Sequence, residues 1–374
     1  MRHYLIFILA LHLYANVNAQ DMDWKSKTSP SYSELINFYK KCAKDNKSIE
    51  LYNMGNSDAG IPIYLCIYNG AGDSLQTFKK ARRSTTLLVN NAIHAGEPDG
   101  VNASAVWLLD LIQQKPNAND PLIAIIPAYN VGGMLNRNSN SRANQEGPEV
   151  YGFRGSARNY DLNRDFIKMD AQNTFTFATI FHALDPDVFV DTHVSNGADY
   201  TYTLTYIASM KERMAPSIKE LTYDVLLPEL NRKVPIFPYV ELKGRTPEEG
   251  IVAFNDLPRY AMGYANLFNS FSFTVETHML KPFPERVKST YDFINELYLW
   301  TKLNSTKVEL ARVQAATFQD QQEYFKFNYT LSDVADSILF KGYKATYPIH
   351  PVTQLPRLNY DRNQMYEQYI PFYN

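Results

Sequence analysis

Short apolar runs recur along the first three quarters of the chain, and each has the length of a β-strand. They span residues 61–68, 85–92, 122–127, 188–192 and 271–276. Several are apolar at successive positions, which is typical of strands covered on both faces. Apolar residues at helical spacing lie between them, as in the stripe formed by Val101, Ala105, Leu108, Leu109 and Ile112. Strands that alternate with helices predict a layered α/β fold.

The remaining segments are less regular. Helical patterns also cover residues 175–184 and 285–303, whereas residues 131–158 are rich in Asn, Gly, Ser and Arg and have no period. A loop of that length inside a compact domain is usually functional. Beyond residue 304 the pattern weakens, with a helix expected over 308–322, a strand over 323–329 and no period in 347–374. Residues 305–374 are therefore expected to form a C-terminal extension of uncertain fold.

Composition narrows the class of protein. The chain has 374 residues, of which 45% are hydrophobic, and this is enough for one large core. Its formal net charge of −2 gives no reason to expect a nucleic-acid partner. The only cysteines, Cys42 and Cys66, are too few for a disulfide scaffold. They either pair in an oxidising compartment or are buried as free thiols.

The N-terminus has the pattern of an export signal. Met1-Arg2-His3 is a short basic start, and the apolar run over residues 5–15 is shorter than the roughly 20 residues that span a bilayer. Val17-Asn18-Ala19 supplies the small residues at which a signal peptidase cleaves. We expect residues 1–19 to be a signal peptide, and the mature protein to be periplasmic or extracellular without stable membrane insertion.

Four residues at the ends of predicted strands suggest metal chemistry. His94 and Glu97 follow the strand 85–92 and can face the same way if the chain coils there. His193 and Glu276 end two later strands, and in open α/β sheets ligands gather at strand ends. Two imidazoles, one carboxylate and a second, unliganded carboxylate make up a hydrolytic zinc site with an open position for water. The occurrence of all four residues in this order is a far stronger indication of a metal site than the HxxE spacing alone.

A second motif places an amide beside a guanidinium, at Asn163 and Arg164. The planar fork of an arginine can bond both oxygens of a carboxylate, so this pair could bind an acidic group. The alternative is an ordinary surface ion pair between Arg164 and either Asp165 or Asp161.

Together these motifs make the chain resemble a zinc metallocarboxypeptidase of the carboxypeptidase A/B superfamily. The resemblance covers roughly residues 32–302 and rests on four ordered motifs, namely HAGE (94–97), DLNRDF (161–166), DTH (191–193) and TVE (274–276). It implies a three-layer α/β/α fold around a mixed, mostly parallel twisted sheet. It also implies a catalytic domain over residues 20–304, one Zn²⁺ ion, and a peptide substrate with a free C-terminus.

The resemblance implies roles for individual residues. Asn163 and Arg164 would bind the terminal carboxylate of the peptide, and Glu276 would act as the general base. Zinc would be held by His94, Glu97 and His193. Asp161 matches an acid that orients the first histidine, because a ligating imidazole needs its other N–H held.

Other roles stay open. Arg154, nine residues before Asn163, matches an arginine that polarises the scissile carbonyl, but Arg137 and Arg142 compete for that role. Substrate-binding candidates before the catalytic glutamate are Tyr260, Tyr264 and Arg259. If Arg259 lines the pocket, an acidic leaving residue would be favoured.

Three functions compete. A secreted carboxypeptidase would act on peptides or on peptidoglycan stem peptides. A zinc deacylase of N-acyl amino acids, related to succinylglutamate desuccinylase and aspartoacylase, shares the HxxE and NR elements. The first motif of those enzymes normally reads HGNE, whereas this one reads HAGE. An inactive, zinc-free binding protein is disfavoured, because all three ligands and Glu276 are retained.

Overall fold

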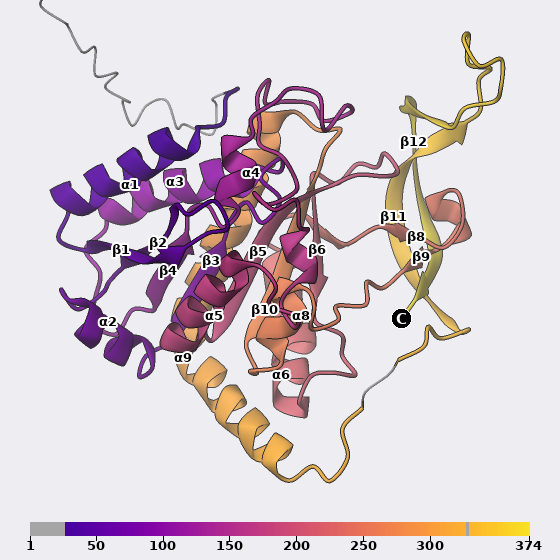
Figure 1. Ribbon diagram of the computed structural model, residues 1–374. Helices are drawn as coiled ribbons and strands as arrows, with labels where there is room; N and C mark the ends of the chain where they lie inside the picture. The colour runs from indigo at the N-terminus through magenta and orange to yellow at the C-terminus, as the bar shows by residue number, and fades with distance from the viewer. Residues whose placement is uncertain (1–26, 327–328) are drawn as a thin grey trace, which may run out of the picture.

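The computed structural model describes residues 27–326 and 329–374 (Figure 1). The predicted signal peptide, residues 1–19, lies outside the described part of the chain. Among the helices that the structure describes, none combines the length and the apolar character needed to cross a bilayer.

The core of the molecule is a mixed sheet of eight strands in the order β1-β2-β4-β3-β5-β10-β6-β7. The strands are β1 (Ile49–Asn56), β2 (Pro62–Tyr68), β3 (Thr86–Asn90), β4 (Leu122–Ile126), β5 (Val188–Ser195), β6 (Leu204–Ala208), β7 (Ile236–Pro238) and β10 (Phe271–His278). The four central strands, β4, β3, β5 and β10, run parallel to one another, whereas β1, β2 and β6 pair antiparallel. All five strands predicted from apolar runs are present.

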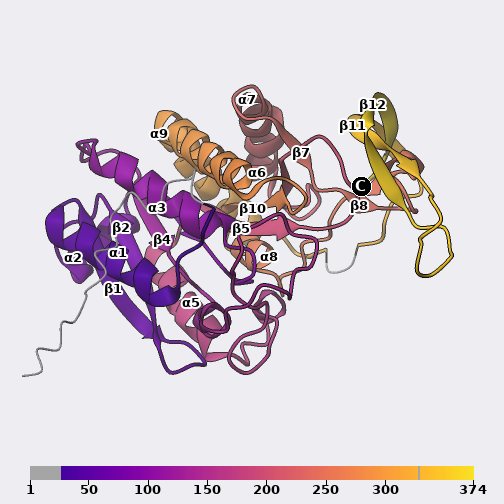
Figure 2. The same ribbon diagram turned by 90° about the horizontal axis from the view of Figure 1, so that it is seen from above.

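Helices cover both faces of this sheet. The main helices are α1 (Tyr32–Asp45), α2 (Ser74–Ala81), α3 (Asp99–Ile112), α5 (Gln172–Leu184), α8 (Ala261–Asn266) and α9 (Phe283–Asp320). Figure 2 shows α3 and α9 on one face and α5 and α8 on the other. Every residue of β3 and β4 is buried, which explains why these strands are apolar at successive positions. The predicted three-layer α/β/α architecture is confirmed.

Shorter elements connect these layers. They are α4 (Val131–Leu135), η2 (Leu162–Arg164), α6 (Pro216–Glu220), the π-helical turn η3 (Leu221–Leu226), α7 (Leu227–Asn231) and η4 (Pro247–Glu249). Apart from α4, the predicted loop over residues 131–158 contains only an isolated bridge between Asn138 and Tyr151. The loop folds back on the HAGE turn, where the Gly152 N–H donates to the Ala95 carbonyl at 3.0 Å. A Cβ on Gly152 would lie 2.6 Å from that of Ala95, so only glycine permits this approach.

Strand register brings the predicted site residues to one edge of the sheet. In the parallel pair β5–β10, His193 lies opposite Glu276, and in β3–β5, Asn90 lies opposite Asp191. The carboxyl ends of β3, β5 and β10 therefore meet, and the HAGE turn that follows β3 lies over them.

The C-terminal region differs from its prediction. Residues 335–374 form a long hairpin of β11 (Ala335–Thr346) and β12 (Asn359–Tyr373), which joins β9 (Ile251–Val252) and β8 (Glu241–Leu242) in a second sheet (Figure 1). The strand predicted over 323–329 is wrong, because 323–326 and 329 belong to no strand. The boundary predicted at residue 304 falls within α9, where Asn304 departs from helical dihedral angles.

The hairpin is fixed to the main body by a small core and by an ion pair in which only the aspartate is buried. The core contains Tyr200, Phe237, Ile251, Phe340 and Ile370. Arg362 of β12 donates from Nε to the buried Asp199 carboxylate at 2.7 Å. The hairpin is therefore packed against the part of the protein that contains the candidate site.

Both cysteines are buried free thiols, as one of the two sequence interpretations expected. Burial raises the pKa of Cys42 to about 11 and that of Cys66 well above its usual value. Buried thiols of raised pKa are poor nucleophiles, so neither cysteine is a candidate for catalysis.

Candidate metal centre and catalytic cavity

His94, Glu97 and His193 converge on one point, and we call these three residues the ligand group. A turn in which the Glu97 N–H donates to the His94 carbonyl at 2.9 Å places these two side chains on the same side. The Nδ1 atoms of His94 and His193 lie 3.3 and 3.0 Å from the two oxygens of Glu97. All three side chains are buried, and one ligand atom from each lies within 4.8 Å of the others.

The other ring nitrogens of the two histidines are held by carboxylates. His94 Nε2 lies 2.9 Å from Asp161 Oδ1, and His193 Nε2 lies 2.8 Å from Asp191 Oδ2. An N–H donated to a carboxylate at Nε2 leaves the Nδ1 lone pair directed to the common centre. Two imidazoles fixed in this tautomer and one carboxylate oxygen are a donor set that fits a zinc ion.

Asp191 was not assigned a role from the sequence, although it belongs to the DTH motif. It lies two residues before His193 on the same strand, so both side chains point to the same face. It is fully buried, and its other oxygen accepts from the Asn90 side-chain amide at 2.9 Å. The alternation of the strand was the signal that could have identified it.

Positive charge surrounds the ligand group. Arg142 Nη1 lies 2.8 Å and Arg154 Nη1 3.5 Å from Glu97 Oε1. Burial alone would raise the pKa of Glu97, but the charges of His94 and Arg142 outweigh it and hold the pKa well below its usual value. Arg154 also bonds Asp161 at 2.9 Å. Arg137 faces away, because it donates to the carbonyls of Ser29, Pro30 and Val150.

Glu276 opens onto the same cavity from β10. It is not part of the ligand group, but its position opposite His193 in the register keeps the two side chains on one face of the sheet. Burial raises the pKa of Glu276 to about 8; the charge of His193 opposes this effect and that of Glu97 adds to it. A carboxyl group with a pKa near neutrality can both accept and release a proton.

Asn163 and Arg164 also line the cavity, and the Asn163 amide nitrogen lies 3.5 Å from His193 Nε2. Asn163 is buried and accepts the Ala261 N–H at 3.0 Å, which fixes its amide against α8. The Arg164 guanidinium lies over the Tyr260 ring, 4.5 Å from its centroid. Within residues 27–326 and 329–374, no carboxylate approaches Arg164 within the 4.0 Å of an ion pair. The surface ion pair considered as an alternative is therefore not formed.

The three candidates that precede β10 occupy different places. Tyr260 lines the cavity. Arg259 is exposed on the outside of Tyr260, where its Nη2 donates to the phenol oxygen at 2.9 Å. Tyr264 lies in the aromatic core under the sheet, and its hydroxyl pairs with His182 Nε2 at 2.7 Å. The structure thus brings Tyr260 to the site but neither Arg259 nor Tyr264, because successive residues of the 259–264 segment point in different directions.

One cavity of about 320 Å³ is lined by the ligand group together with Arg142, Arg154, Asn163, Arg164, Tyr260 and Glu276. Ile207, Tyr239, Phe254, Met262 and Thr274 also line it and are mostly apolar or aromatic. Ile207 and Thr274 are cross-strand partners on β6 and β10, on the same face as Glu276. Tyr239 and Phe254 lie in irregular segments, and no pattern in the sequence indicates that they belong to the site.

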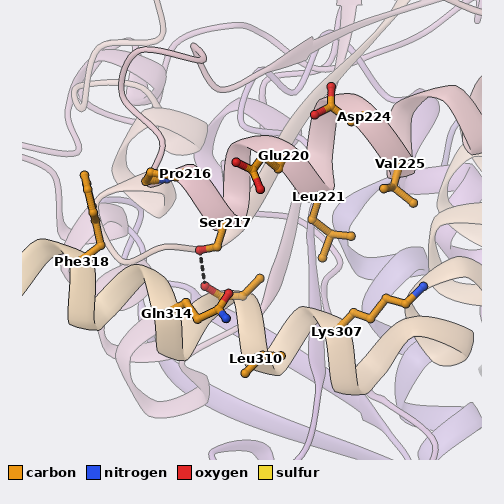
Figure 3. A pocket seen from close by; sticks show the side chains of 11 residues that line it. Pro216, Ser217, Glu220, Leu221, Asp224, Val225, Lys307, Leu310, Gln314 and Phe318 are labelled. Atoms are coloured by element: carbon orange, nitrogen blue, oxygen red, sulfur yellow. Dashed lines mark hydrogen bonds between the residues drawn. The ribbon is translucent and has the colours of Figure 1, made fainter.

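A larger hollow of about 640 Å³ lies elsewhere, between the α6–η3 segment and the C-terminal half of α9 (Figure 3). Leu221, Val225, Leu310 and Phe318 line it, and Lys307 reaches across it. It contains neither a histidine nor a cysteine. Size alone would select this groove, but the smaller cavity contains the chemically useful groups.

Comparisons with known proteins support the fold. No protein-family model matches the chain, and no curated protein does either. Solved structures do match. A metallo-carboxypeptidase from Pseudomonas aeruginosa, in complex with (2-guanidinoethylmercapto)succinic acid, aligns with a TM-score of 0.55 and 13% identity, over 75% of this chain and 70% of that one.

Two further structures give the same result. Carboxypeptidase A from Helicoverpa armigera aligns with a TM-score of 0.54 and 13% identity, over 81% of this chain and 78% of that one. A metallo-carboxypeptidase from Burkholderia cenocepacia aligns with a TM-score of 0.53 and 14% identity, over 74% of this chain and 70% of that one. The resemblance noted in the sequence is confirmed at the level of the fold: this chain has the architecture of solved metallocarboxypeptidases.

Proposed function

We propose that the protein is a zinc-dependent metallocarboxypeptidase that hydrolyses the C-terminal amide bond of peptides. The observation that carries this proposal is the shared cavity, which is lined both by the ligand group and by the guanidinium of Arg164, a group with no carboxylate partner among the described residues. A peptide held by its terminal carboxylate at Arg164 would present its last amide bond to the ligand group. This arrangement favours removal of one residue over cleavage inside a chain.

The ligand group would hold zinc through His94 Nδ1, His193 Nδ1 and the Glu97 carboxylate. When bound, zinc would supply a Lewis acid that makes water acidic near neutral pH. Asp161 and Asp191 would keep both imidazoles in the ligating tautomer, since each accepts an Nε2–H.

Glu276 would move the proton. Its carboxylate takes a proton from the water that attacks the scissile carbonyl, and passes this proton to the departing amine nitrogen. The amide C–N bond then breaks, and the products are a shortened peptide and a free amino acid. The buried position of Glu276 suits this role, because burial raises its pKa to about 8.

The arginines would stabilise charge. Arg154 and Arg142 both direct a guanidinium nitrogen to the Glu97 side of the cavity, where negative charge develops on the carbonyl oxygen. A donor of this kind contributes about 3 kcal/mol to lowering a barrier. Asn163 and Arg164 would bind the terminal carboxylate through charge-assisted hydrogen bonds.

One experiment tests the reaction class. Zinc-loaded protein is incubated with a mixed peptide library and with the same peptides carrying C-terminal amides, and the released products are identified by mass spectrometry. We expect single amino acids from the free peptides and none from the amidated ones. Internal fragments, or acyl groups released from blocked amino acids, would contradict the proposal.

A further inference from the structure

The loop that connects β11 to β12 exposes several large apolar side chains. This loop spans residues 347–358, and we call it the hairpin tip. Val352 is 83% and Leu355 64% exposed, so both side chains lie mostly in water. Figure 1 and Figure 2 both show the hairpin tip projecting away from the main body. Its exposed apolar residues are Tyr347, Ile349, Val352, Leu355 and Leu358. Apolar side chains gathered at one exposed place indicate an interaction surface.

The backbone of the hairpin tip forms many of its hydrogen bonds within the loop. The His350 N–H donates to the Leu355 carbonyl, and the His350 carbonyl accepts the Gln354 N–H, both at 2.9 Å. The His350 Nδ1 atom accepts the backbone N–H groups of Val352 and Thr353, each at 3.3 Å. Other positions of the loop carry proline, which has no N–H to satisfy. This internal pairing lowers the cost of moving the loop from water into a less polar environment.

The charge around the hairpin tip is of one sign. From residue 337 to residue 360 the chain contains no acidic residue. Lys344 and Arg357 lie close to the two ends of the hairpin tip, and no carboxylate of the described residues lies within the 4.0 Å of an ion pair from either. Asp361, which lies opposite Lys344 in the strand register, accepts from Asn363 and Gln364 instead. The hairpin tip thus combines an apolar end with a cationic base.

These features favour a lipid surface over a protein groove. The projecting loop can enter the boundary between headgroups and acyl chains, where its apolar side chains leave water. Lys344 and Arg357 would then lie at the level of the headgroup phosphates, and the ring of Tyr347 is of the kind enriched at this boundary. Binding of this kind is peripheral and needs no helix that crosses the bilayer.

We propose that the hairpin tip binds the protein reversibly to the surface of anionic membranes. The proposal stands on the hairpin tip alone and does not depend on the carboxypeptidase function. Because a small core and the contact between Arg362 and Asp199 fix the hairpin to the main body, attachment through the tip would also hold the main body at the membrane surface.

The test measures co-sedimentation of the mature protein, residues 20–374, with vesicles. One set of vesicles contains equal parts of phosphatidylglycerol and phosphatidylcholine, and the other contains phosphatidylcholine alone. We expect binding to the anionic vesicles that weakens as salt is added. Binding to the neutral vesicles should be roughly 5- to 25-fold weaker, because each of the two basic residues contributes about fivefold at an anionic surface.

A double variant tests the apolar end. Val352→Ser with Leu355→Ser should lower the partition constant by about tenfold or more, because two side chains no longer leave water on binding. The matched control is Leu303→Ser with Val313→Ser, which removes the same two residue types from positions of α9 that are 85% and 65% exposed. This control should bind the vesicles like the wild type. Thermal unfolding shows that each variant is folded.

A second double variant tests the cationic base. Lys344→Gln with Arg357→Gln should weaken binding to the anionic vesicles by about 25-fold and leave binding to the neutral ones unchanged.

Three results would overturn the proposal: no binding of the wild type, equal binding to both kinds of vesicle, or equal losses in the tip variant and the α9 control. Analytical ultracentrifugation adds a fourth. Dimers that form without vesicle binding and are lost in Val352→Ser with Leu355→Ser would show that the hairpin tip contacts a second copy of the chain instead.

Discussion

The two ends of the catalytic cavity are built in different ways. The ligand group comes from turns and strand ends of the parallel sheet, where register brings His193 beside Glu276 and the HAGE turn over both. Tyr239 and Phe254, which line the same cavity, come from irregular segments before β8 and after β9, and β9 pairs with a hairpin from the far end of the chain. Regular structure thus fixes the position of the chemical groups, whereas irregular segments and long-range strand pairing place the aromatic lining.

This contrast predicts that changes near the ligand group act on turnover and metal binding, while changes at the other end act on substrate choice. The largest effect is expected at Glu276. Glu276→Gln keeps the size of the side chain but cannot accept the proton, so kcat should fall by about 10²–10⁴-fold. Zinc content, measured by mass spectrometry of the metal, should equal that of the wild type. Near-normal kcat in zinc-replete Glu276→Gln protein would remove this residue from the mechanism.

The second-largest effect is expected at Arg164, which would bind the terminal carboxylate of the substrate. Arg164→Ala should lower kcat/KM for peptides with a free C-terminus by about 10- to 150-fold, from the ~1.5–3 kcal/mol of hydrogen bonds to charged groups. Arg259→Ala is the matched control, because Arg259 lies over the same Tyr260 ring at 5.0 Å but outside the cavity. Steady-state kinetics should show little change for this control. Equal losses in both variants would mean that Tyr260 packing, and not a carboxylate contact, explains the effect.

A smaller effect is expected at Asp191, whose carboxylate orients the His193 ring. Asp191→Asn retains the shape of the side chain but removes its charge, so zinc affinity should fall by about 10- to 100-fold. Competition with a chromophoric chelator measures this affinity. Asp256→Asn, a change at a buried carboxyl group outside the ligand group, should leave the affinity unchanged. Unaltered zinc affinity in Asp191→Asn would show that Asp191 is merely structural.

The same contrast explains which parts of the fold and of the site can be predicted from the sequence. The central strands were identified because burial on both faces makes β3 and β4 apolar throughout. The four residues of the metal and base motifs were identified because His94 and Glu97 follow β3, and because His193 and Glu276 lie near the ends of β5 and β10. In contrast, β12 has exposed residues at most positions and no alternation, so nothing in its sequence distinguishes it from a loop.

The positions of Tyr239 and Phe254 in the cavity could not be predicted, and the reason is physical. Tyr239 and Phe254 reach the cavity because β8 and β9 pair with the hairpin, and such long-range pairing leaves no local pattern in the sequence. Tyr264 was named as a candidate on the same basis as Tyr260, but its ring faces the aromatic core next to Phe166 and Phe181. Proximity in sequence to the catalytic strand was therefore an insufficient guide.

The smallest expected effect concerns the pH dependence of stability and the buried carboxyl group of Asp256. Burial raises the pKa of Asp256 to about 6, although Arg213 opposes this effect. The folded state therefore holds this proton to a higher pH than the unfolded state, and stability falls as pH rises from about 4 to about 6. Asp256→Asn, which cannot ionise, should recover on the order of 2 kcal/mol at pH 7.5 and little at pH 4. Urea unfolding at both pH values measures the difference, and an equal effect at both would contradict the assignment.

We propose above all that His94, Glu97 and His193 together hold one divalent ion in front of Glu276. The most direct measurement is zinc stoichiometry with X-ray absorption of the bound metal, in the wild type and in His193→Ala. We predict one zinc per chain, coordinated by two imidazole nitrogens and carboxylate oxygen, and a lost or strongly weakened site in the variant. A wild-type protein that binds no zinc under metal-replete conditions, or a zinc environment unchanged by His193→Ala, would contradict the account.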